Sequence, residues 1–202
     1  MLVLATTNRK KAKELVRLLA GVRVEVRTLA DFPDPIDVVE DGETFAENAA
    51  KKAVAQARHL GCWALGEDSG LTVDALGGAP GVYSARFSGP KATDAANNEL
   101  LLHQLAGMPA AQRGAAYVCH MVLADPSGKV RAESQGTCRG RILPELRGTA
   151  GFGYDPLFEL VEYHRSFGQM GPVAKAILSH RARAARRLMP ELVALVDSHE
   201  LT

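Results

Sequence analysis

The sequence predicts an α/β fold, because short apolar runs typical of buried strands alternate with longer segments whose apolar residues recur at helical spacing. Its 202 residues are 47% hydrophobic and 23% charged, which is the composition of a folded chain long enough to bury a substantial core. No repeat and no Ser-rich linker divides the chain. We therefore expect a single domain over residues 1–202, in which any two lobes share a sheet or a packed seam.

The first strand and the first helix are predicted at the start of the chain. Residues 1–5 are an apolar run typical of a strand buried on both faces, and residues 6–8, Thr-Thr-Asn, supply turn and cap chemistry. Residues 9–20 have helical periodicity and are followed by Gly21, a typical C-terminal cap. Residues 22–27 alternate with a period of two, which predicts a strand with one face in water.

A second helix is predicted from Thr44, which forms a capping box with Glu47, and it runs until Gly61. Residues 62–66 are again a short apolar run typical of a buried strand. Residues 67–70, Glu-Asp-Ser-Gly, follow directly and are expected at the carboxyl end of that strand. Ligands of α/β sheets bind at such ends.

The rest of the chain is predicted to add two helices, a hairpin and a loop. These are a helix over 93–106, a hairpin of strand 115–125 and the segment from Lys129, a Gly-rich loop over 148–153, and a helix that opens at Ser179. We expect a break or kink at Pro190, because proline has no amide donor and costs about 3 kcal/mol inside a helix.

Charge and composition bear on the class of ligand. Lys and Arg number 24 against 23 Asp and Glu, a formal charge of +1, so no global field favours nucleic acid or an anionic membrane. Aromatic residues make up only 5%, and apolar runs such as Met1 to Ala5 fall far below the ~20 residues of a membrane span. Three cysteines without a CxxC pair, and no signal peptide, indicate reduced packing thiols in a cytoplasmic protein. We expect a small-molecule ligand, with no nucleic acid and no membrane as partners.

The first candidate site is the turn between the first strand and the first helix. A helix start exposes backbone amides at the positive end of the helix dipole, where phosphate fits. Its side chains can donate to or neutralise phosphoryl oxygens, and they are Thr6, Thr7, Asn8, Arg9, Lys10 and Lys11. The chain has no Walker motif and no GxGxxG after a strand. The alternative interpretation is a capped basic helix with no ligand.

The second candidate site is acidic. It contains Glu40, in a polar loop, and the pair Glu67 and Asp68 after a buried run. Such a small set of carboxylates suits Mg²⁺, which takes one or two carboxylates together with water and substrate phosphates. The alternative for Glu40 is a solvated loop acid, whereas surface acids are less expected directly after the apolar run at Glu67 and Asp68.

The third candidate site contains side chains that can recognise a nucleotide base. Aromatic rings can stack on a purine, while Arg donates hydrogen bonds and His donates from either ring nitrogen according to its tautomer. The residues are Phe152, Gly153, Tyr154, Asp155, Lys175, His180 and Arg181. The alternative is that the Arg-rich run is the solvated face of a helix and that the aromatic residues belong to the core.

At these residues the sequence resembles the inosine triphosphate pyrophosphatase family, whose members hydrolyse purine nucleoside triphosphates with unusual bases. The resemblance covers nearly the whole chain in order. It includes Leu4 to Asn8 with Lys11, Glu40 to Gly42 with Thr44, Phe45, Asn48 and Ala49, Glu67 to Leu71, Leu76 to Arg86, Gly151 to Phe158, and Lys175 to Arg181.

The resemblance implies a homodimeric, Mg²⁺-dependent enzyme that converts ITP, dITP and XTP to the monophosphate and pyrophosphate. It implies an α/β fold of two lobes around a long mixed sheet with flanking helices and an active-site cleft between the lobes. Carried over by position, Thr6 to Lys11 grip the triphosphate, Glu40 and Asp68 hold the metal, Asp68 accepts the proton, and Ser69 contacts the substrate. Phe152 to Asp155, Lys175, His180 and Arg181 contact the nucleotide.

The chain departs from the family pattern at three places. Glu67 stands where the family often has Asp, so it could ligate the metal directly or through water. Val173 and Ala174 precede Lys175 where the family often has an acid, which removes a possible anchor for the lysine. Residues 9–10, Arg-Lys, occupy a first turn that often contains Gly.

The mechanism expected from these residues is attack of water at the α-phosphorus, with Asp68 orienting and deprotonating the water. His180 and Arg181 would donate hydrogen bonds to a 6-oxo group. The 6-amino group of ATP is itself a donor, so it would not pair with them. Two alternatives remain open from the sequence. One is a nucleotide sensor that binds without hydrolysis, and the other is a nucleic-acid-binding module built on the Arg-rich helix after Ser179.

Overall fold

The computed structural model describes residues 1–201, and across them the strands form one mixed sheet in the order β2-β1-β3-β4-β5-β6-β7. Strand β1 is parallel to β2 and β3, whereas β6 is antiparallel to β5 and β7. The strands are β1 (Leu2–Leu4), β2 (Val26–Thr28), β3 (Trp63–Val73), β4 (Gly114–Ala124), β5 (Val130–Ile142), β6 (Phe158–Leu160) and β7 (Arg165–Ser166).

Five α-helices flank the sheet within the described residues. They are α1 (Arg9–Leu19), α2 (Phe45–Leu60), α3 (Asp94–Gln104), α4 (Phe167–Leu178) and α5 (His180–Asp197). The chain forms two compact units, and β3, β4 and β5 contribute residues to both. Unit 1 contains residues 1–68, 119–136 and 181–202, and unit 2 contains residues 69–118 and 137–180.

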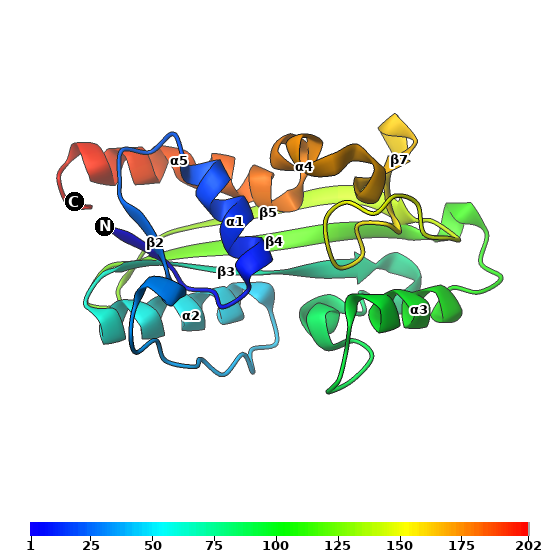
Figure 1. Ribbon diagram of the computed structural model, residues 1–202, viewed down its shortest axis with the longest axis horizontal. Coiled ribbons are helices and arrows are strands. Elements are labelled where there is room, and N and C mark those ends of the chain that lie inside the picture. Colours follow the sequence, from blue (N-terminus) through cyan, green and yellow to red (C-terminus); the bar gives the residue numbers. More distant parts are fainter. Residues whose placement is uncertain (202) are drawn as a thin grey trace. The chain divides into compact units, whose positions relative to one another are not determined.

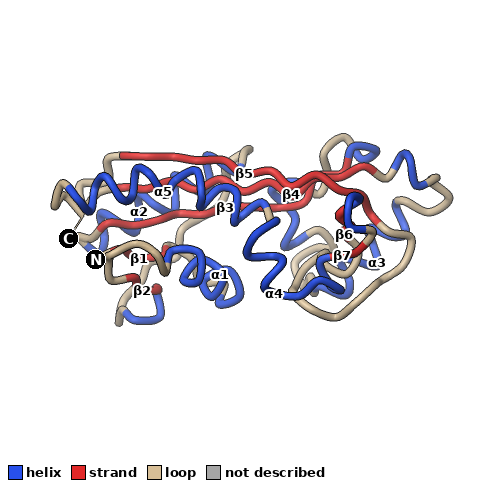
Figure 2. The backbone as a smooth tube through the Cα atoms, turned by 90° about the horizontal axis from the view of Figure 1, so that it is seen from above, coloured by secondary structure: helices blue, strands red, loops and turns tan. Residues whose placement is uncertain are grey.

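In unit 1 helices cover both faces of the sheet, with α1 and α5 on one face and α2 on the other (Figure 1). The alternation of side chains along β4 explains the two layers. Cys119 and Met121 pack with the leucines of α1 and α5, whereas Val122 and Ala124 pack with the alanines of α2. Figure 2 shows β2 and β1 lying beside β3, with α1 following β1.

In unit 2 the core contains a group of packed aromatic rings. The rings of Tyr117 and Phe158 lie 4.6 Å apart, and those of Phe158 and Phe167 are stacked at 5.7 Å. Leu101 and Leu105 of α3 belong to the same buried cluster. These rings make α4 part of the core, although no sequence pattern had predicted a helix there.

Several local predictions are confirmed. Asn8 and Thr44 cap α1 and α2, and Gly61 ends α2 in the left-handed conformation with φ 62°. Two details are wrong: α1 ends on Ala20 in a right-handed conformation, and Glu47 accepts from the amide of Glu43 rather than closing the box on Thr44. The cysteine interpretation holds for Cys119 and Cys138, whose thiols are buried, while Cys62 is partly exposed.

Two larger predictions are wrong. Residues 67–70 do not follow a strand but lie inside β3, which continues to Val73 because the residues after Gly70 are again apolar and buried. Helix α5 continues through Pro190 to Asp197, so the helix does not break at the proline as expected, while a kink there stays a prediction. Leu188 and Leu192, on either side of the proline, are both fully buried, and their burial holds this segment helical against the core despite the missing amide. None of the helices in residues 1–201 has the length and apolar character of a membrane span.

Candidate active site

The beginning of α1 is organised by Asn8. Its Oδ1 accepts from the amides of Lys10 at 3.0 Å and Lys11 at 3.2 Å, and its own amide donates to Oγ1 of Thr6. The capped-helix interpretation is therefore correct for these two amides. Thr7, Arg9 and Lys10 are exposed, whereas Lys11 turns back to the carboxylate of Glu67 at 3.0 Å.

The topology brings this helix start to the middle of β3. Leu4, the last residue of β1, pairs with Leu65, and the amide of Ala5 donates to the carbonyl of Leu65. Strand β3 continues past this point, so Glu67 and Asp68 follow where β1 has ended and α1 begins. Because β3 is longer than its parallel neighbour β1, two carboxylates of β3 lie beside the beginning of the helix that follows β1.

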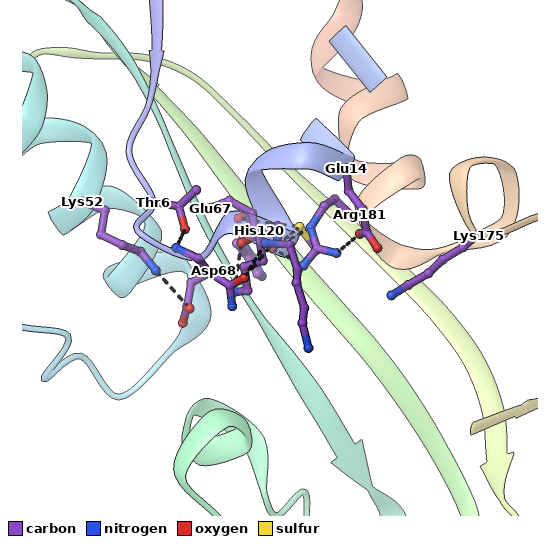
Figure 3. A network of polar contacts seen from close by, with 12 residues as sticks. Thr6, Glu14, Lys52, Glu67, Asp68, His120, Lys175 and Arg181 are labelled. Carbon is purple, nitrogen blue, oxygen red and sulfur yellow. Dashed lines mark hydrogen bonds and ion pairs between the residues drawn. The ribbon is translucent and has the colours of Figure 1, made fainter. Parts of the chain in front are cut away.

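Glu67 and Asp68 make their contacts in opposite directions, as consecutive residues of a strand do. Glu67 is fully buried and contacts Lys11, Cys119 and Arg181. Asp68 is 7% exposed, and its Oδ1 accepts from Nζ of Lys52 on α2 at 3.1 Å (Figure 3).

Lys52 joins Asp68 to Glu40. The same ammonium donates to Oε2 of Glu40 at 2.6 Å, so carboxylates from two distant segments meet on one cation. Helix α2 can come this close because residue 66 is glycine: a Cβ there would lie 2.1 Å from the carbonyl oxygen of Ala49. The absence of a side chain at Gly66 therefore sets the distance between the helix and the two acids that follow.

The segment that carries Glu40 has no regular secondary structure and is held by polar side chains of α2. Oδ1 of Asn48 accepts a hydrogen bond from the amide of Gly42 at 2.8 Å, and Nε2 of Gln56 donates one to the carbonyl of Ile36 at 2.6 Å. Asn48, Lys52 and Gln56 are spaced four apart and all buried. Lys52 was not among the predicted site residues, and this polar stripe on an otherwise alanine-lined face was the signal that could have found it.

Burial and neighbouring charges shift the ionisation of the pair. Burial raises the pKa of Asp68, Lys52 and Lys11 oppose this rise, and Glu67 adds to it. For Lys52 burial lowers the pKa, but the carboxylates of Asp68 and Glu40 outweigh burial and leave it raised. Lys52 is therefore firmly charged, and Asp68 is a carboxylate with more affinity for a proton than an exposed one.

The acidic residues fit a cation that completes its ligands from elsewhere. Within residues 1–201 no group of three or more His, Cys, Asp or Glu side chains is arranged to hold a metal ion. Glu40 and Asp68 nevertheless converge on a single point of positive charge. Two carboxylates are what Mg²⁺ takes from a protein when phosphates and water supply the other oxygens.

In unit 2, Asp155 organises the predicted base-reading residues. Its Oδ2 accepts from Nζ of Lys175 at 2.6 Å and from the amide of Phe152 at 2.8 Å, while Oδ1 accepts from the hydroxyl of Tyr117 at 3.4 Å. The ammonium of Lys175 lies 4.0 Å from the centre of the Phe152 ring. The anchor for Lys175 that residues 173–174 do not provide is supplied by Asp155.

The other predicted residues of unit 2 are also fixed by the core. His180 is 3% exposed and stacks on Tyr117 with ring centres 4.7 Å apart. The hydroxyl of Tyr154 donates to the carbonyl of Ser84, and the carbonyl of Gly153 accepts from Nδ2 of Asn98. Ser69, in β3, is partly buried.

Arg181 lies in unit 1 and is 1% exposed. Its Nε and Nη2 donate to Oε1 of Glu67 at 3.2 and 2.9 Å, and Nη1 donates to Glu14 of α1. Glu14 was not among the predicted site residues. The contacts described for Arg181 thus direct its guanidinium at two carboxylates of unit 1.

Comparison with known proteins agrees with this arrangement of elements. The model of the Ham1 family matches residues 2–191. The chain belongs to the Ham1 family. A dITP/XTP pyrophosphatase of Rhodopirellula baltica is 54% identical to this Ham1 chain over 98% of the chain and 95% of the relative.

Two solved structures match the Ham1 chain over nearly its whole length. A HAM1 protein from Coxiella burnetii has a TM-score of 0.87 and 36% identity, covering 96% of this chain and 98% of that one. A nucleoside-triphosphatase, a dITP/XTP pyrophosphatase, from Mycobacterium abscessus has a TM-score of 0.75 and 42% identity, covering 95% and 98%. The predicted mixed α/β fold is therefore the fold of this family.

Proposed function

We propose that this chain hydrolyses dITP, ITP and XTP to the nucleoside monophosphate and pyrophosphate. The observation that carries the proposal is the convergence of Asp68 and Glu40 on Lys52, beside a helix start that carries Lys11. This combination of acids and lysines suits a triphosphate with its cation. The names of the relatives, dITP/XTP pyrophosphatase, agree with such a substrate.

Glu40 and Asp68 are the proposed ligands of Mg²⁺. The ion would neutralise charge on the triphosphate and make pyrophosphate a better leaving group. Glu67 makes its described contacts with Lys11, Cys119 and Arg181, which supports an indirect role for it at most. Lys52 bridges the two ligands and would turn to the phosphates when the carboxylates bind the ion.

Asp68 is the proposed general base. Its buried carboxylate has a raised pKa, which suits a group that must take a proton from water. The water would attack the α-phosphorus in line with the leaving pyrophosphate. Thr6 to Lys11 would grip the phosphate chain, with Lys11 and Lys52 as point charges, and Ser69, which follows Asp68 in β3, would contact the substrate.

The purine is assigned to residues of unit 2. Phe152 would stack on the base, with Gly153 to Asp155 and Lys175 around it, and His180 would donate to the 6-oxo group. A 6-amino group offers a donor where His180 needs an acceptor. A mismatch of this kind, when buried, costs about 1 to 3 kcal/mol. We also propose a homodimer in the cytoplasm as the working form.

The experiment is pyrophosphate release from dITP, ITP, XTP, ATP and GTP, with Mg²⁺ and with excess EDTA, for the wild type and Asp68→Asn. We expect turnover of the first three that needs Mg²⁺ and falls by about a hundredfold or more in the variant. Asp197→Asn, which alters an exposed acid of α5, is the control.

The same experiment separates the alternatives. A nucleotide sensor would bind dITP without releasing pyrophosphate. A nucleic-acid-binding module would show steeply salt-dependent binding of DNA and no turnover. ATP turnover equal to that of ITP would contradict the proposed selectivity.

A further inference from the structure

Two consecutive asparagines of α3 are buried, although asparagine is found mostly at protein surfaces. Asn97 is 3% and Asn98 6% exposed, and both lie in unit 2 with the loop of residues 151–155. A buried amide is stable only when its polar atoms find hydrogen-bond partners. The partners of these two side chains therefore show what each of them holds in place.

Asn98 joins α3 to the loop of residues 151–155. Its Nδ2 donates to the carbonyl of Asp94, one turn earlier in the helix, at 2.8 Å and to the carbonyl of Gly153 at 2.9 Å. These two bonds use both hydrogens of the amide. Its Oδ1 is buried and has no hydrogen-bond partner in the part of the chain that the structure describes. The first bond thus fixes the amide on the helix, and the second fixes the loop to the amide.

Gly153 is the point at which the loop turns. Its φ of 62° lies in the left-handed region, which glycine adopts readily. The residue before it, Phe152, has its backbone amide held by a carboxylate at 2.8 Å, and the residue after it, Tyr154, donates its hydroxyl to the carbonyl of Ser84 at 2.8 Å. Asn98 therefore holds the turn between two aromatic residues that are themselves held at separate points.

The neighbouring asparagine secures the segment that receives the tyrosine. Oδ1 of Asn97 accepts from the amide and the hydroxyl of Ser88, both at 2.8 Å, and its Nδ2 donates to the carbonyls of Ser84 and Ala85. The carbonyl of Ser84 consequently accepts from both Asn97 and Tyr154. Adjacent residues of one helix thus hold the loop directly and the support on which the loop rests.

We propose that Asn98 is a positioning residue for recognition of the base. By holding the carbonyl of Gly153 it fixes the turn next to Phe152, on which the base stacks in the proposed function, so the inference rests on that function. Both bonds of the Asn98 amide lie within unit 2, whereas the proposed phosphate residues, Thr6 to Lys11 and Lys52, belong to unit 1. Loss of the amide should therefore weaken selection of the base and leave the grip on the phosphates intact.

The test compares Asn98→Ser and Asn98→Leu with the wild type on dITP, XTP and ATP. Serine inside a helix donates its hydroxyl to the carbonyl four residues earlier, so Asn98→Ser can keep the bond to Asp94 and loses only the one to Gly153. Asn98→Leu loses both bonds but fills the space with a side chain of similar size. If the loop bond is the one that matters, both variants should show the same change in base selection.

A buried carbonyl that loses its donor changes an equilibrium by about ten- to a hundredfold. We expect kcat/KM for dITP and XTP to fall by about that factor, mainly through a higher KM, because the contact with the base is weakened in the ground state as well. ATP uses the base contacts poorly from the start, so the ratio of kcat/KM for dITP to that for ATP should fall by about tenfold. Inhibition by pyrophosphate should be unchanged.

The control is Glu99→Gln, which alters the next residue of α3, an exposed acid. It should leave the dITP to ATP ratio, the KM values and the inhibition by pyrophosphate as in the wild type. Circular dichroism and a melting curve give the folded fraction of each variant, and the rates are expressed per folded enzyme. A general loss of folded protein would lower the rates for all substrates by one factor.

The outcomes separate the inference from the proposed function. A wild type that hydrolyses no triphosphate removes the proposed function. With an active wild type, a loss of equal size for dITP and ATP, or an equally large loss of inhibition by pyrophosphate, shows that Asn98 does not act on the base and overturns the inference. An unchanged kcat/KM for dITP in folded Asn98→Ser also overturns it.

Discussion

Nζ of Lys52 lies 3.1 Å from Oδ1 of Asp68, so the one buried ammonium on the inner face of α2 is directed at a carboxylate in the middle of β3. The alanines of α2 and the bare backbone at Gly66 allow this approach. The contact joins two segments 16 residues apart into one polar centre. Asp68 and Glu67 therefore have different partners, since Asp68 contacts α2 whereas Glu67 contacts residues of α1 and α5.

Lys52→Gln should lower turnover of dITP by about a hundredfold, because the two acids lose the cation that they share and the phosphates lose a point charge. Lys51→Gln is the matched control. Lys51 is the preceding residue of the same helix and pairs with Asp41 at the surface, so its loss should change the rate by less than about twofold. Steady-state pyrophosphate release measures both, and equal losses in the two variants would contradict the assignment.

Gly66→Ala should destabilise the protein by about 1 to 3 kcal/mol, since the new methyl group meets the backbone of Ala49 at 2.1 Å and helix α2 must shift. The shift should also lower activity, because it moves Lys52 away from Asp68. Gly21→Ala adds a methyl group where no atom lies within 4 Å and serves as the control. Urea unfolding curves measure the difference, and similar midpoints for the two variants would refute the close-approach argument.

Asp155→Asn should reduce the free energy of unfolding by about 3 to 5 kcal/mol, because it leaves the ammonium of Lys175 buried without its carboxylate. Asp197→Asn breaks the exposed pair with Arg23 and should change stability by less than about 1 kcal/mol. Chemical denaturation followed by circular dichroism compares them. An Asp155→Asn variant as stable as Asp197→Asn would show that the pair contributes little.

Thiol reactivity should distinguish Cys119 from Cys62. Burial, and then the charge of Glu67, raise the pKa of Cys119 well above 9.0, so its thiol stays protonated as pH rises through the range where an ordinary thiol ionises. Iodoacetamide at about pH 8 to 9 should therefore modify Cys62 in the native protein and spare Cys119. Peptide mass spectrometry reads the sites, with denatured protein as the fully reactive reference. Rapid native labelling of Cys119 would contradict its burial.

Much of the fold could be predicted because its signals are local. Strand β1, the cap at Asn8 and the left-handed end of α2 at Gly61 each depend on a few adjacent residues. Helix α4 could not be predicted in this way. It contains Gly171 in a non-helical conformation and Pro172, and it is held by the packing of Phe167 among rings from distant strands.

The sequence by itself determined the residue types of the candidate site and their order along the chain. Acids, lysines and a capped helix start can be recognised from neighbours in sequence. Only the tertiary structure decided which of them meet: Lys52 with Glu40 and Asp68, Asp155 with Lys175, and Glu14 with Arg181. These contacts depend on how far β3 runs and how closely a helix approaches it. Both are set by packing between segments that lie far apart in the sequence.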